Sequence, residues 1–237
     1  TESGSTPLIV IDGVERASLD GIDMNEIESI NVLKDASATA VFGIRGANGV
    51  IILTTKVGAE SKPKVSLSMN VGWQTPTKLP DFLNAYEFAL LKNEGIVNDD
   101  PNANPQYTPE MLDKFRNGSD PVFFPVENLY SRFFKDTAMR QQYNINVNGG
   151  TKVTKYFVSL GYLKQDGIYD TKPLKPLNVG YDPNPVYNRY NVRVNLDFNF
   201  TRNLSASIKL GGQFGDYNHP NRTTENLFSS ILNSPPM

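Results

Sequence analysis

The chain has 237 residues and a formal net charge of −2, and 39% of its residues are hydrophobic. This length fits one or two folded domains, and the near-neutral charge gives no support for a nucleic-acid-binding surface. The chain contains no Cys, which excludes disulfides, Cys-ligated metals and thiol catalysis within it. It also contains no run of about eighteen apolar residues, such as a transmembrane helix requires.

The first 58 residues predict a small α/β unit, because short β-branched runs alternate with short helical segments. The expected elements are strands at Leu8–Ile11, Ser29–Leu33 and Val50–Thr55, and a helical turn at Asn25–Glu28. Asp12–Gly13 is expected to end the first strand. The run Val50–Thr55 is apolar at most positions, so we expect it to lie centrally in its sheet, covered on both faces.

A glycine-rich connection precedes that central strand. The segment Asp35–Phe42 predicts a short helix, with Asp35 as its N-cap and Gly43 at its end. Gly46 and Gly49 then lead into the strand. A phosphate-binding loop leaves a strand and opens a helix, whereas the order here is reversed. The spacing therefore favours a tight helix-to-strand connection over a ligand loop.

After residue 58 the pattern changes to strict alternation, most clearly over Arg189–Phe200. The apolar positions are Tyr190, Val192, Val194, Leu196, Phe198 and Phe200, and the polar positions are Arg189, Asn191, Arg193, Asn195, Asp197 and Asn199. Similar alternation occurs at 65–74, 143–148, 156–163 and 204–211. Such a pattern is typical of strands with one apolar and one polar face.

Two environments produce this pattern: a soluble β-sandwich, and a transmembrane barrel with lipid outside and water inside. Three features favour the barrel: strands of about ten residues, alternating short turns and long loops, and aromatic residues near strand ends. Those aromatic residues are Trp73, Tyr143, Tyr162, Tyr169, Tyr190, Phe200 and Tyr217. Five strands cannot close a membrane barrel, which needs about eight, so we expect a meander in chain order with both outer strands unpaired.

The barrel interpretation assigns an environment to each face of the segment Arg189–Phe200. Residues such as Val194 would face lipid, and residues such as Asn195 would face a water-filled lumen. We therefore expect Val194→Arg to cost about 2–4 kcal/mol near the bilayer midplane. On the same basis Asn195→Arg would cost much less.

Two stretches, "PLIVIDGV" (Pro7–Val14) and "IESINVLKDASATAVFGIRGANGVIILTTK" (Ile27–Lys56), resemble the plug domain of TonB-dependent outer-membrane receptors of the SusC/RagA branch. Two later stretches, "YFVSLGYLKQDGIY" and "YNRYNVRVNLDFNFTRNLS", resemble early barrel strands of that branch. The resemblance implies a mainly β chain. Residues 1–58 would be the C-terminal part of a small α/β plug, and 59–237 the N-terminal portion of the barrel, an antiparallel meander of about five transmembrane strands with long extracellular loops.

The positions that match the plug signature are Asp12, Gly13, Lys34, Asp35, Gly43, Arg45, Gly46, Asn48 and Gly49. On this interpretation the glycines serve close packing inside the lumen. Arg45 either pairs with carboxylates of the lumen or lies solvated in a loop.

The resemblance also implies a function, namely active import of glycans or peptides across the bacterial outer membrane. The implied partners are TonB of the inner-membrane energising complex, a SusD-like surface lipoprotein, an oligosaccharide or peptide substrate, and outer-membrane lipid, with no nucleic acid and no cofactor. Family members are several times longer, so we expect the signal peptide, the TonB box, the early plug and most of the barrel to be missing here. The alternative is a soluble β-rich carbohydrate-binding or adhesion module.

No catalytic or metal site is predicted, and an enzyme is the weakest hypothesis. His219 is the only histidine and lies in a predicted exposed loop. The segment Asp100–Gln106 begins like a calcium loop but has Pro105 at the position of the required glycine. The segment Leu83–Gly95 predicts an amphipathic helix with a wide apolar face. Loop aromatics that are candidates for stacking on sugars, or for loop packing, are Tyr107, Phe123, Phe124 and Tyr130.

Overall fold

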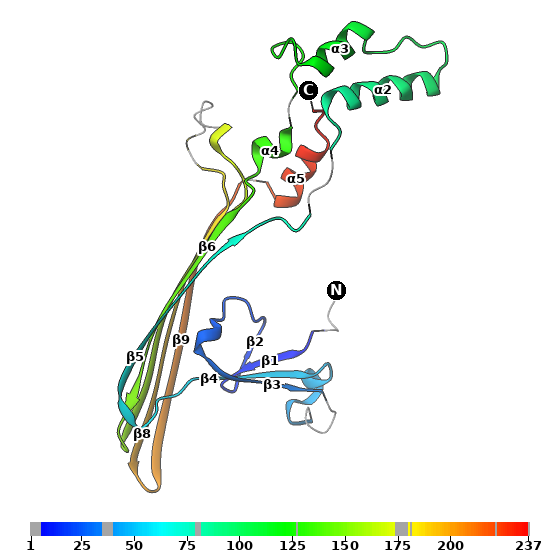
Figure 1. Ribbon diagram of the computed structural model, residues 1–237. Coiled ribbons are helices and arrows are strands. Elements are labelled where there is room, and N and C mark those ends of the chain that lie inside the picture. The colour runs from blue at the N-terminus through cyan, green and yellow to red at the C-terminus, as the bar shows by residue number, and fades with distance from the viewer. Residues whose placement is uncertain are drawn as a thin grey trace. The chain divides into compact units, whose positions relative to one another are not determined.

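The computed structural model describes residues 6–34, 40–78, 82–126, 128–173, 180, 182–220 and 222–236. The chain forms two compact units. The first comprises residues 1–72, 140–165 and 187–216, and the second comprises residues 73–139, 166–186 and 217–237. The first unit contains a small α/β sheet and a sheet of long strands, and the second contains α2–α5 (Figure 1). None of the helices in the described part of the chain combines the length and the hydropathy needed to span a bilayer.

The small sheet has the strand order β2-β1-β4-β3. Its elements are β1 (Leu8–Ile11), β2 (Val14–Arg16), η1 (Met24–Glu26), β3 (Ile27–Leu33) and β4 (Val50–Thr55). β4 pairs parallel with β1 and antiparallel with β3, so it is an inner strand, as predicted. Its residue Leu53 is fully buried in a core with Ile9 and Ile11. This core supplies the apolar burial that stabilises the small sheet.

The Asp12–Gly13 turn joins β1 to β2, a short strand that the sequence did not predict. Asp12 has φ 48° and Gly13 has φ 87°. Two consecutive residues with positive φ form the type I′ hairpin turn, for which Asp-Gly is a preferred sequence. The turn also directs the Asp12 carboxylate to the end of β4, where Thr55 N and Thr55 Oγ1 donate to it at 3.0 and 2.5 Å.

The glycine-rich connection is built from 3-10 turns. The first part of the predicted helix, Asp35–Thr39, lies outside the described residues. Residues Ala40–Gly46 form η2, which is interrupted at Gly43, where φ is 59° and ψ is −147°. Gly49 has φ 92°, and a Cβ atom there would lie 3.1 Å from the carbonyl oxygen of Leu33. The glycines therefore serve a tight turn into β4.

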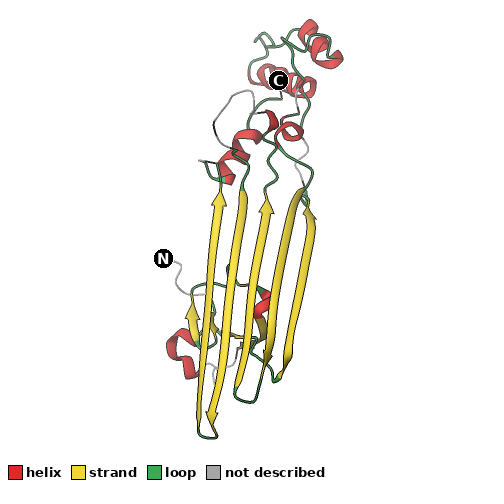
Figure 2. Cartoon of the chain, turned by 90° about the vertical axis from the view of Figure 1, so that its left-hand side faces the viewer, coloured by secondary structure: helices red, strands yellow, loops and turns green. Residues whose placement is uncertain are grey.

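The long sheet, which we call the wall, is a single layer of long strands that lie side by side (Figure 2). Its strands follow chain order, β5-β6-β7-β8-β9. The strands are β5 (Ser61–Gln74), β6 (Ala138–Gly150), β7 (Thr154–Asp166), β8 (Val186–Thr201) and β9 (Leu204–Asn218). β6 and β7 pair antiparallel from Arg140↔Gln165 to Gly150↔Lys155. β5 and β9 are the outer strands and do not pair with each other within the described sheet, which confirms the predicted open meander.

The wall strands are longer than a bilayer crossing requires. They have 13 to 16 residues, whereas a tilted transmembrane strand needs about 9–11. Short turns at 151–153 and 202–203 alternate with long connections at 75–137 and 167–185. This is the predicted alternation of an outer-membrane barrel.

The second unit contains the helices α2 (Ala85–Asp99), α3 (Pro109–Asn117), α4 (Leu129–Phe133) and α5 (Thr224–Leu232). Asn84 and Glu87 form a capping box at the start of α2. The prediction of a wide apolar face for this helix is wrong. Its buried stripe is Ala85, Ala89 and Asn93, while Leu90 and Leu91 are exposed. Phe115 of α3 packs against Ala85 and Ala89, whereas Asn93 exchanges hydrogen bonds with the backbone of Tyr107.

The loop aromatics of the second unit mostly pack against one another. Tyr107 and Phe124 lie edge-on to Phe115, with ring centroids 6.0 and 5.3 Å apart. Tyr130 stacks on Phe134 at 4.3 Å. Of the candidates for sugar stacking, Phe123 alone is largely exposed.

Candidate functional site

The small sheet rests on one face of the wall through polar side chains, and we call this contact the seam. All of its residues belong to the first compact unit. On the side of the small sheet they are Gly21, Asp12, Asp23, Asn25, Glu26, Thr55 and Lys56, and on the wall Gln142, Asn144, Asn191, Arg193, Asn195 and Lys209. The wall residues lie at alternating positions and so define its inner face.

Asp23 inserts into a socket in the wall. It caps η1 by accepting from Asn25 N at 2.9 Å. It also accepts from Gln142 Nε2 at 3.3 Å and from Asn144 Nδ2. A Cβ atom at Gly161 would lie 2.6 Å from Asp23 Oδ2, so the glycine of β7 makes the room that the carboxylate occupies.

Arg193 of β8 bridges two carboxylates of the small sheet. Its Nε donates to Glu26 Oε2 at 2.6 Å, and its Nη1 lies 3.9 Å from Asp12 Oδ2. Lys209 Nζ of β9 lies 3.1 Å from Asp12 Oδ1. The network contains two acidic and two basic groups, and Asp12, Glu26 and Arg193 are largely buried. Buried charges of this kind depend on their partners, because an unpaired charge in the interior is costly.

The pKa values of the two carboxyl groups, Asp12 and Glu26, shift in opposite net directions. Burial raises the pKa of Glu26, and the hydrogen bond and charge of Arg193 offset only part of this effect. Burial also raises the pKa of Asp12, but hydrogen bonds from Thr55 and Lys209 outweigh it and hold that pKa below its ordinary value. Asp12 is therefore the firmly charged member of the network, and Glu26 is the member that takes up a proton more readily.

The structure corrects the environment predicted for Asn195. The alternation along β8 is confirmed, since Asn191 and Asn195 are buried while Val192 is exposed on the other face. Asn195 does not face water, however. It is 1% exposed, and its Nδ2 donates to Thr55 Oγ1 at 2.8 Å and to Lys56 O at 2.7 Å. The expectation that Asn195→Arg is cheap is therefore wrong, because an arginine would displace the end of β4.

The signature residues do not gather at one point. Asp12 lies in the seam, and Gly13, Gly43 and Gly49 serve turns with positive φ. Arg45 of η2 pairs with Glu15 of β2 rather than with a carboxylate of the wall, and its side chain is 73% exposed.

The remaining signature residues lie away from the seam contacts described above. Gly46 is buried and accepts from Gly49 N at 3.0 Å, and Lys34 and Asn48 are exposed. Asp35 lies outside the described residues.

Sequence reasoning did not identify Asp23 and Glu26 as site residues, and it placed Arg193 on a strand face expected to be exposed to water. The usable signal was the run of polar residues at every second position of β8. That run marks the face of the strand, but it does not reveal what covers the face.

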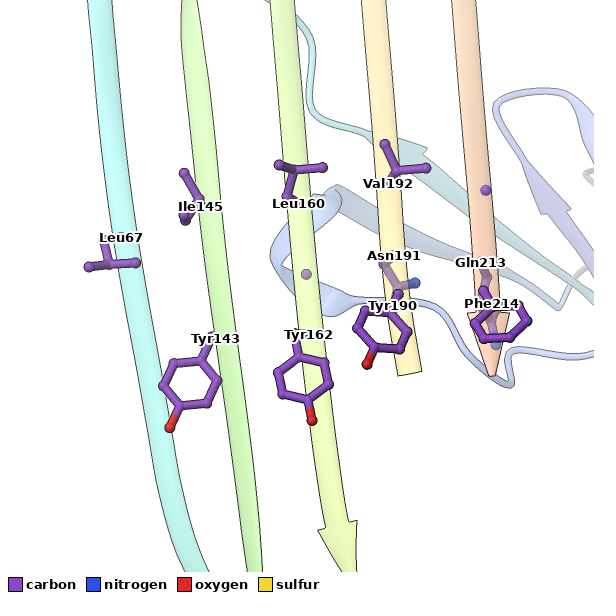
Figure 3. A pocket seen from close by; sticks show the side chains of 12 residues that line it. Leu67, Tyr143, Ile145, Leu160, Tyr162, Tyr190, Asn191, Val192, Gln213 and Phe214 are labelled. Carbon is purple, nitrogen blue, oxygen red and sulfur yellow. The ribbon is translucent and has the colours of Figure 1, made fainter. Parts of the chain in front are cut away.

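The outer face of the wall carries a row of aromatic rings. Tyr143, Tyr162, Tyr190 and Phe214, from four neighbouring strands, lie at one level (Figure 3). Successive ring centroids are 6.3, 5.0 and 6.2 Å apart. An aliphatic row of Leu67, Ile145, Leu160 and Val192 follows, and together the two rows line an open groove of about 700 Å³.

The hydroxyl groups on the aromatic row meet polar neighbours. Tyr143 OH donates to Gln141 Oε1 and Tyr162 OH donates to Asn188 Oδ1, each at 3.0 Å. Aromatic rings with a polar tip are typical of the membrane–water interface, with aliphatic side chains in the hydrocarbon beyond. The row therefore fits the edge of the lipid-facing band.

The candidate ligand residues of the loops do not assemble. No group of three or more His, Asp or Glu side chains that could hold a metal ion occurs among the residues that the structure describes. Asp100 Oδ1 accepts from Asn102 N at 2.9 Å in a turn after α2. His219 Nδ1 lies 2.8 Å from Pro220 O, and its ring lies 5.3 Å from that of Tyr217.

A small α/β sheet lies on the inner face of the open wall, and the outer face of the wall carries the aromatic and aliphatic rows of a lipid-facing surface. Together these features define the class of outer-membrane barrel proteins that contain a plug. Comparisons with known proteins agree. Residues 2–50 match the TonB-dependent Receptor Plug Domain family. The TonB-dependent receptor P3 of Formosa agariphila is 31% identical over 213 residues, covering 89% of this chain and 17% of that protein. The TonB-dependent receptor SusC of Bacteroides thetaiotaomicron is 29% identical over 223 residues, covering 90% and 20%.

Solved structures show the same architecture. A chain in the structure of the RagAB peptide transporter superposes with a TM-score of 0.70 and 25% identity, covering 91% of this chain and 25% of that one. The chain belongs to the SusC/RagA type of TonB-dependent receptor, a family of the bacterial outer membrane. It spans about a fifth of the length of the curated relatives it matches.

Proposed function

We propose that this chain is part of a TonB-dependent importer that carries glycans or peptides across the outer membrane together with a SusD-like surface lipoprotein. The observation that supports this most is the polar seam between plug and wall. Residues 1–58 would be the C-terminal part of the plug, and residues 59–237 the start of the barrel. The plug-signature residues, from Asp12 to Gly49, would serve the packing of the plug.

An importer needs a plug that seals the lumen and yet can be displaced. A hydrogen bond in such a contact contributes only about 0.5–1.5 kcal/mol net, because water replaces it when it breaks. The contacts of Asn195 with Thr55 and Lys56, and of Asn191 with Gly21, are of this kind. A force transmitted through TonB would therefore break the seam stepwise, because water replaces its hydrogen bonds one at a time.

The nature of the substrate separates two forms of the proposal. The matched RagAB structure is that of a peptide transporter, which supports peptides, while resemblance to the SusC branch supports glycans. The exposed Phe123 in the second unit suits stacking on a sugar ring or an apolar peptide side chain.

The test is growth of the native host, intact or lacking the full-length gene, on a defined oligosaccharide mixture or on a defined peptide mixture as the limiting nutrient. We expect the deletion strain to lose growth on one of the two and a TonB-deficient strain to lose it equally. Restoring the gene should restore growth. Unchanged growth on both nutrients, with no nutrient in a wider panel affected, would contradict the import proposal.

The alternative of a soluble β-rich module makes a different prediction about the wall. Such a module would pair β5 with β9 or cover the outer face, whereas both strands are outer strands of the described sheet. Val65, Leu67 and Met69 of β5 are also largely exposed. We therefore favour the importer.

A further inference from the structure

The inner face of the wall is strongly basic, whereas its outer face is not. Alternation along each strand assigns its residues to the two faces, and the seam residues mark the inner one. The charged residues of the outer face are Lys164, Asp166 and Asp216. On the inner face of these described strands, Asp197 is the one acidic residue. The basic residues there are Arg193 and Lys209 of the seam and five others, which we call the basic strip: Lys62, Lys64, Arg140, Lys155 and Arg189.

Seating of the plug does not account for the basic strip. Arg193 pairs with Glu26, and Lys209 pairs with Asp12, so the plug supplies a carboxylate to each of the two seam cations. None of the five residues of the strip forms an ion pair with any residue that the structure describes. Their positive charges are therefore left over after the seam is formed.

Three lysines of the strip lie at the end of the wall that carries the short turns. Lys155 follows the turn at 151–153, and Lys62 and Lys64 open β5. A Cβ atom at Gly149 would lie 3.0 Å from Pro63 Cα, which places the start of β5 beside the end of β6. The three lysines therefore belong to one end of the inner face.

The two arginines of the strip lie beyond the seam, toward the other end of the wall. Arg140 precedes the seam residue Gln142 by two positions on β6, and Arg189 precedes Asn191 by two on β8. Arg140 is exposed and lies opposite Gln165 of β7 in the strand register. The strip thus extends along the inner face on both sides of the plug contact.

A polar inner face does not require such charge. Neutral residues such as Ser66, Asn70 and Asn146 occupy other positions of the same face. Like charges that share one surface repel one another, but they also raise the local concentration of ions of opposite sign. A surface of this kind favours a negatively charged ligand, and its extent favours one that carries several charges rather than one.

We propose that the receptor binds anionic cargo, namely oligomers with several carboxylate groups, and passes it along the basic strip. This inference rests on the proposed import function and narrows its substrate class. An arginine donates two parallel hydrogen bonds to one carboxylate, and a lysine adds a less directional charge. Acidic oligosaccharides and acidic peptides share this chemistry, so the test has an arm for each.

Titration of the full-length receptor in detergent measures the preference. One arm compares galacturonate oligomers with galactose oligomers of the same length, and the other compares a glutamate-rich peptide with its glutamine counterpart. We expect the acidic member of at least one pair to bind several-fold more tightly than the neutral member. Potassium chloride should reduce this advantage, because salt screens exposed charges. The arm that responds identifies the source of the carboxylates. Equal affinities within both pairs, or no binding in either, would overturn the proposal.

A matched pair of variants assigns the preference to the strip. Arg140→Gln should reduce the advantage of the acidic ligand several-fold. Lys164→Gln is the control, because Lys164 precedes Gln165, the register partner of Arg140, and lies on the outer face. It changes the net charge equally and should leave the preference unchanged. Equal effects of the two variants would show that the preference follows total charge and would refute binding at the strip.

Lysine acylation tests the other end of the strip. An amine-reactive ester modifies exposed lysines, and mass spectrometry of the digested receptor reports the rate at each one. The acidic oligomer or peptide that binds in the titration should slow modification of Lys62 and Lys64, which are exposed. It should leave the rate at Lys92 of α2, which is also exposed, unchanged. Unslowed modification of Lys62 and Lys64 would overturn passage along the strip. Neither experiment involves TonB or growth, so failure of either leaves import to its own test.

Discussion

At the residue scale, Arg193 is the side chain on which the seam depends most. It pairs with Glu26 and lies near Asp12, so its removal leaves two buried carboxylates with fewer partners. We expect Arg193→Met to destabilise the seated plug by about 3–5 kcal/mol, the usual cost of breaking a buried pair. Reversible unfolding of the full-length receptor in lipid measures this. Arg202→Met, in the exposed turn after β8, is the control and should be neutral; similar losses in both variants would contradict the role of Arg193.

The two carboxyl groups of the network predict opposite responses to acid. The pKa of Asp12 is lowered from 3.8, so its stabilising contribution is present above that value and is lost as the pH falls through the still lower pKa of the folded state. The pKa of Glu26 is raised from 4.5, so its protonation above pH 4.5 favours the folded state.

Variants separate the two responses. Asp12→Asn should flatten the loss of stability below pH 3.8, and Glu26→Gln should flatten the change just above pH 4.5. Urea midpoints of the full-length receptor, measured across this pH range, provide the data. An undiminished acid loss in Asp12→Asn would assign that loss to other carboxylates.

At the element scale, β7 is shaped to accept the plug. A Cβ atom at Gly161 would lie 2.6 Å from Asp23 Oδ2 and 2.9 Å from Asn144 Nδ2, whereas a Cβ atom at Gly72 of β5 would meet nothing within 4 Å. We expect Gly161→Ala to cost about 1–3 kcal/mol through overpacking and to speed amide exchange at Asp23–Glu26. Gly72→Ala should leave exchange there unchanged. Slow exchange in both variants would show that the socket is not a close fit.

At the scale of the whole molecule, the wall is expected to place Val194 deep in the bilayer. Val194 lies four residues from Tyr190 of the aromatic row and four from Phe198. Val194→Arg should therefore cost about 2–4 kcal/mol. Asn195 cannot serve as its control, because it is buried under the plug. Ser205 of β9 is exposed on the inner face, so Ser205→Arg should cost much less; equal costs, measured by reversible unfolding in lipid, would refute the assigned facing.

The sequence by itself determined the local features of this protein. The alternation from Arg189 to Phe200 requires a strand with two unlike faces, and Asp12–Gly13 requires a tight turn, since both depend only on neighbouring residues. The plug signature identified the family for the same reason, because it is a continuous stretch of chain.

Only the tertiary structure decided what covers each face. Asn191 bonds to Gly21 across 170 positions of sequence, and Arg193 bonds to Glu26 across 167. Periodicity reports the side on which a residue points, but carries no information about a partner so distant in the chain. The polar face of β8 was therefore predicted to face water, whereas in the structure it contacts the plug. Sequence alone does not separate the two cases, because the same polar atoms that bind water also form the hydrogen bonds of the seam.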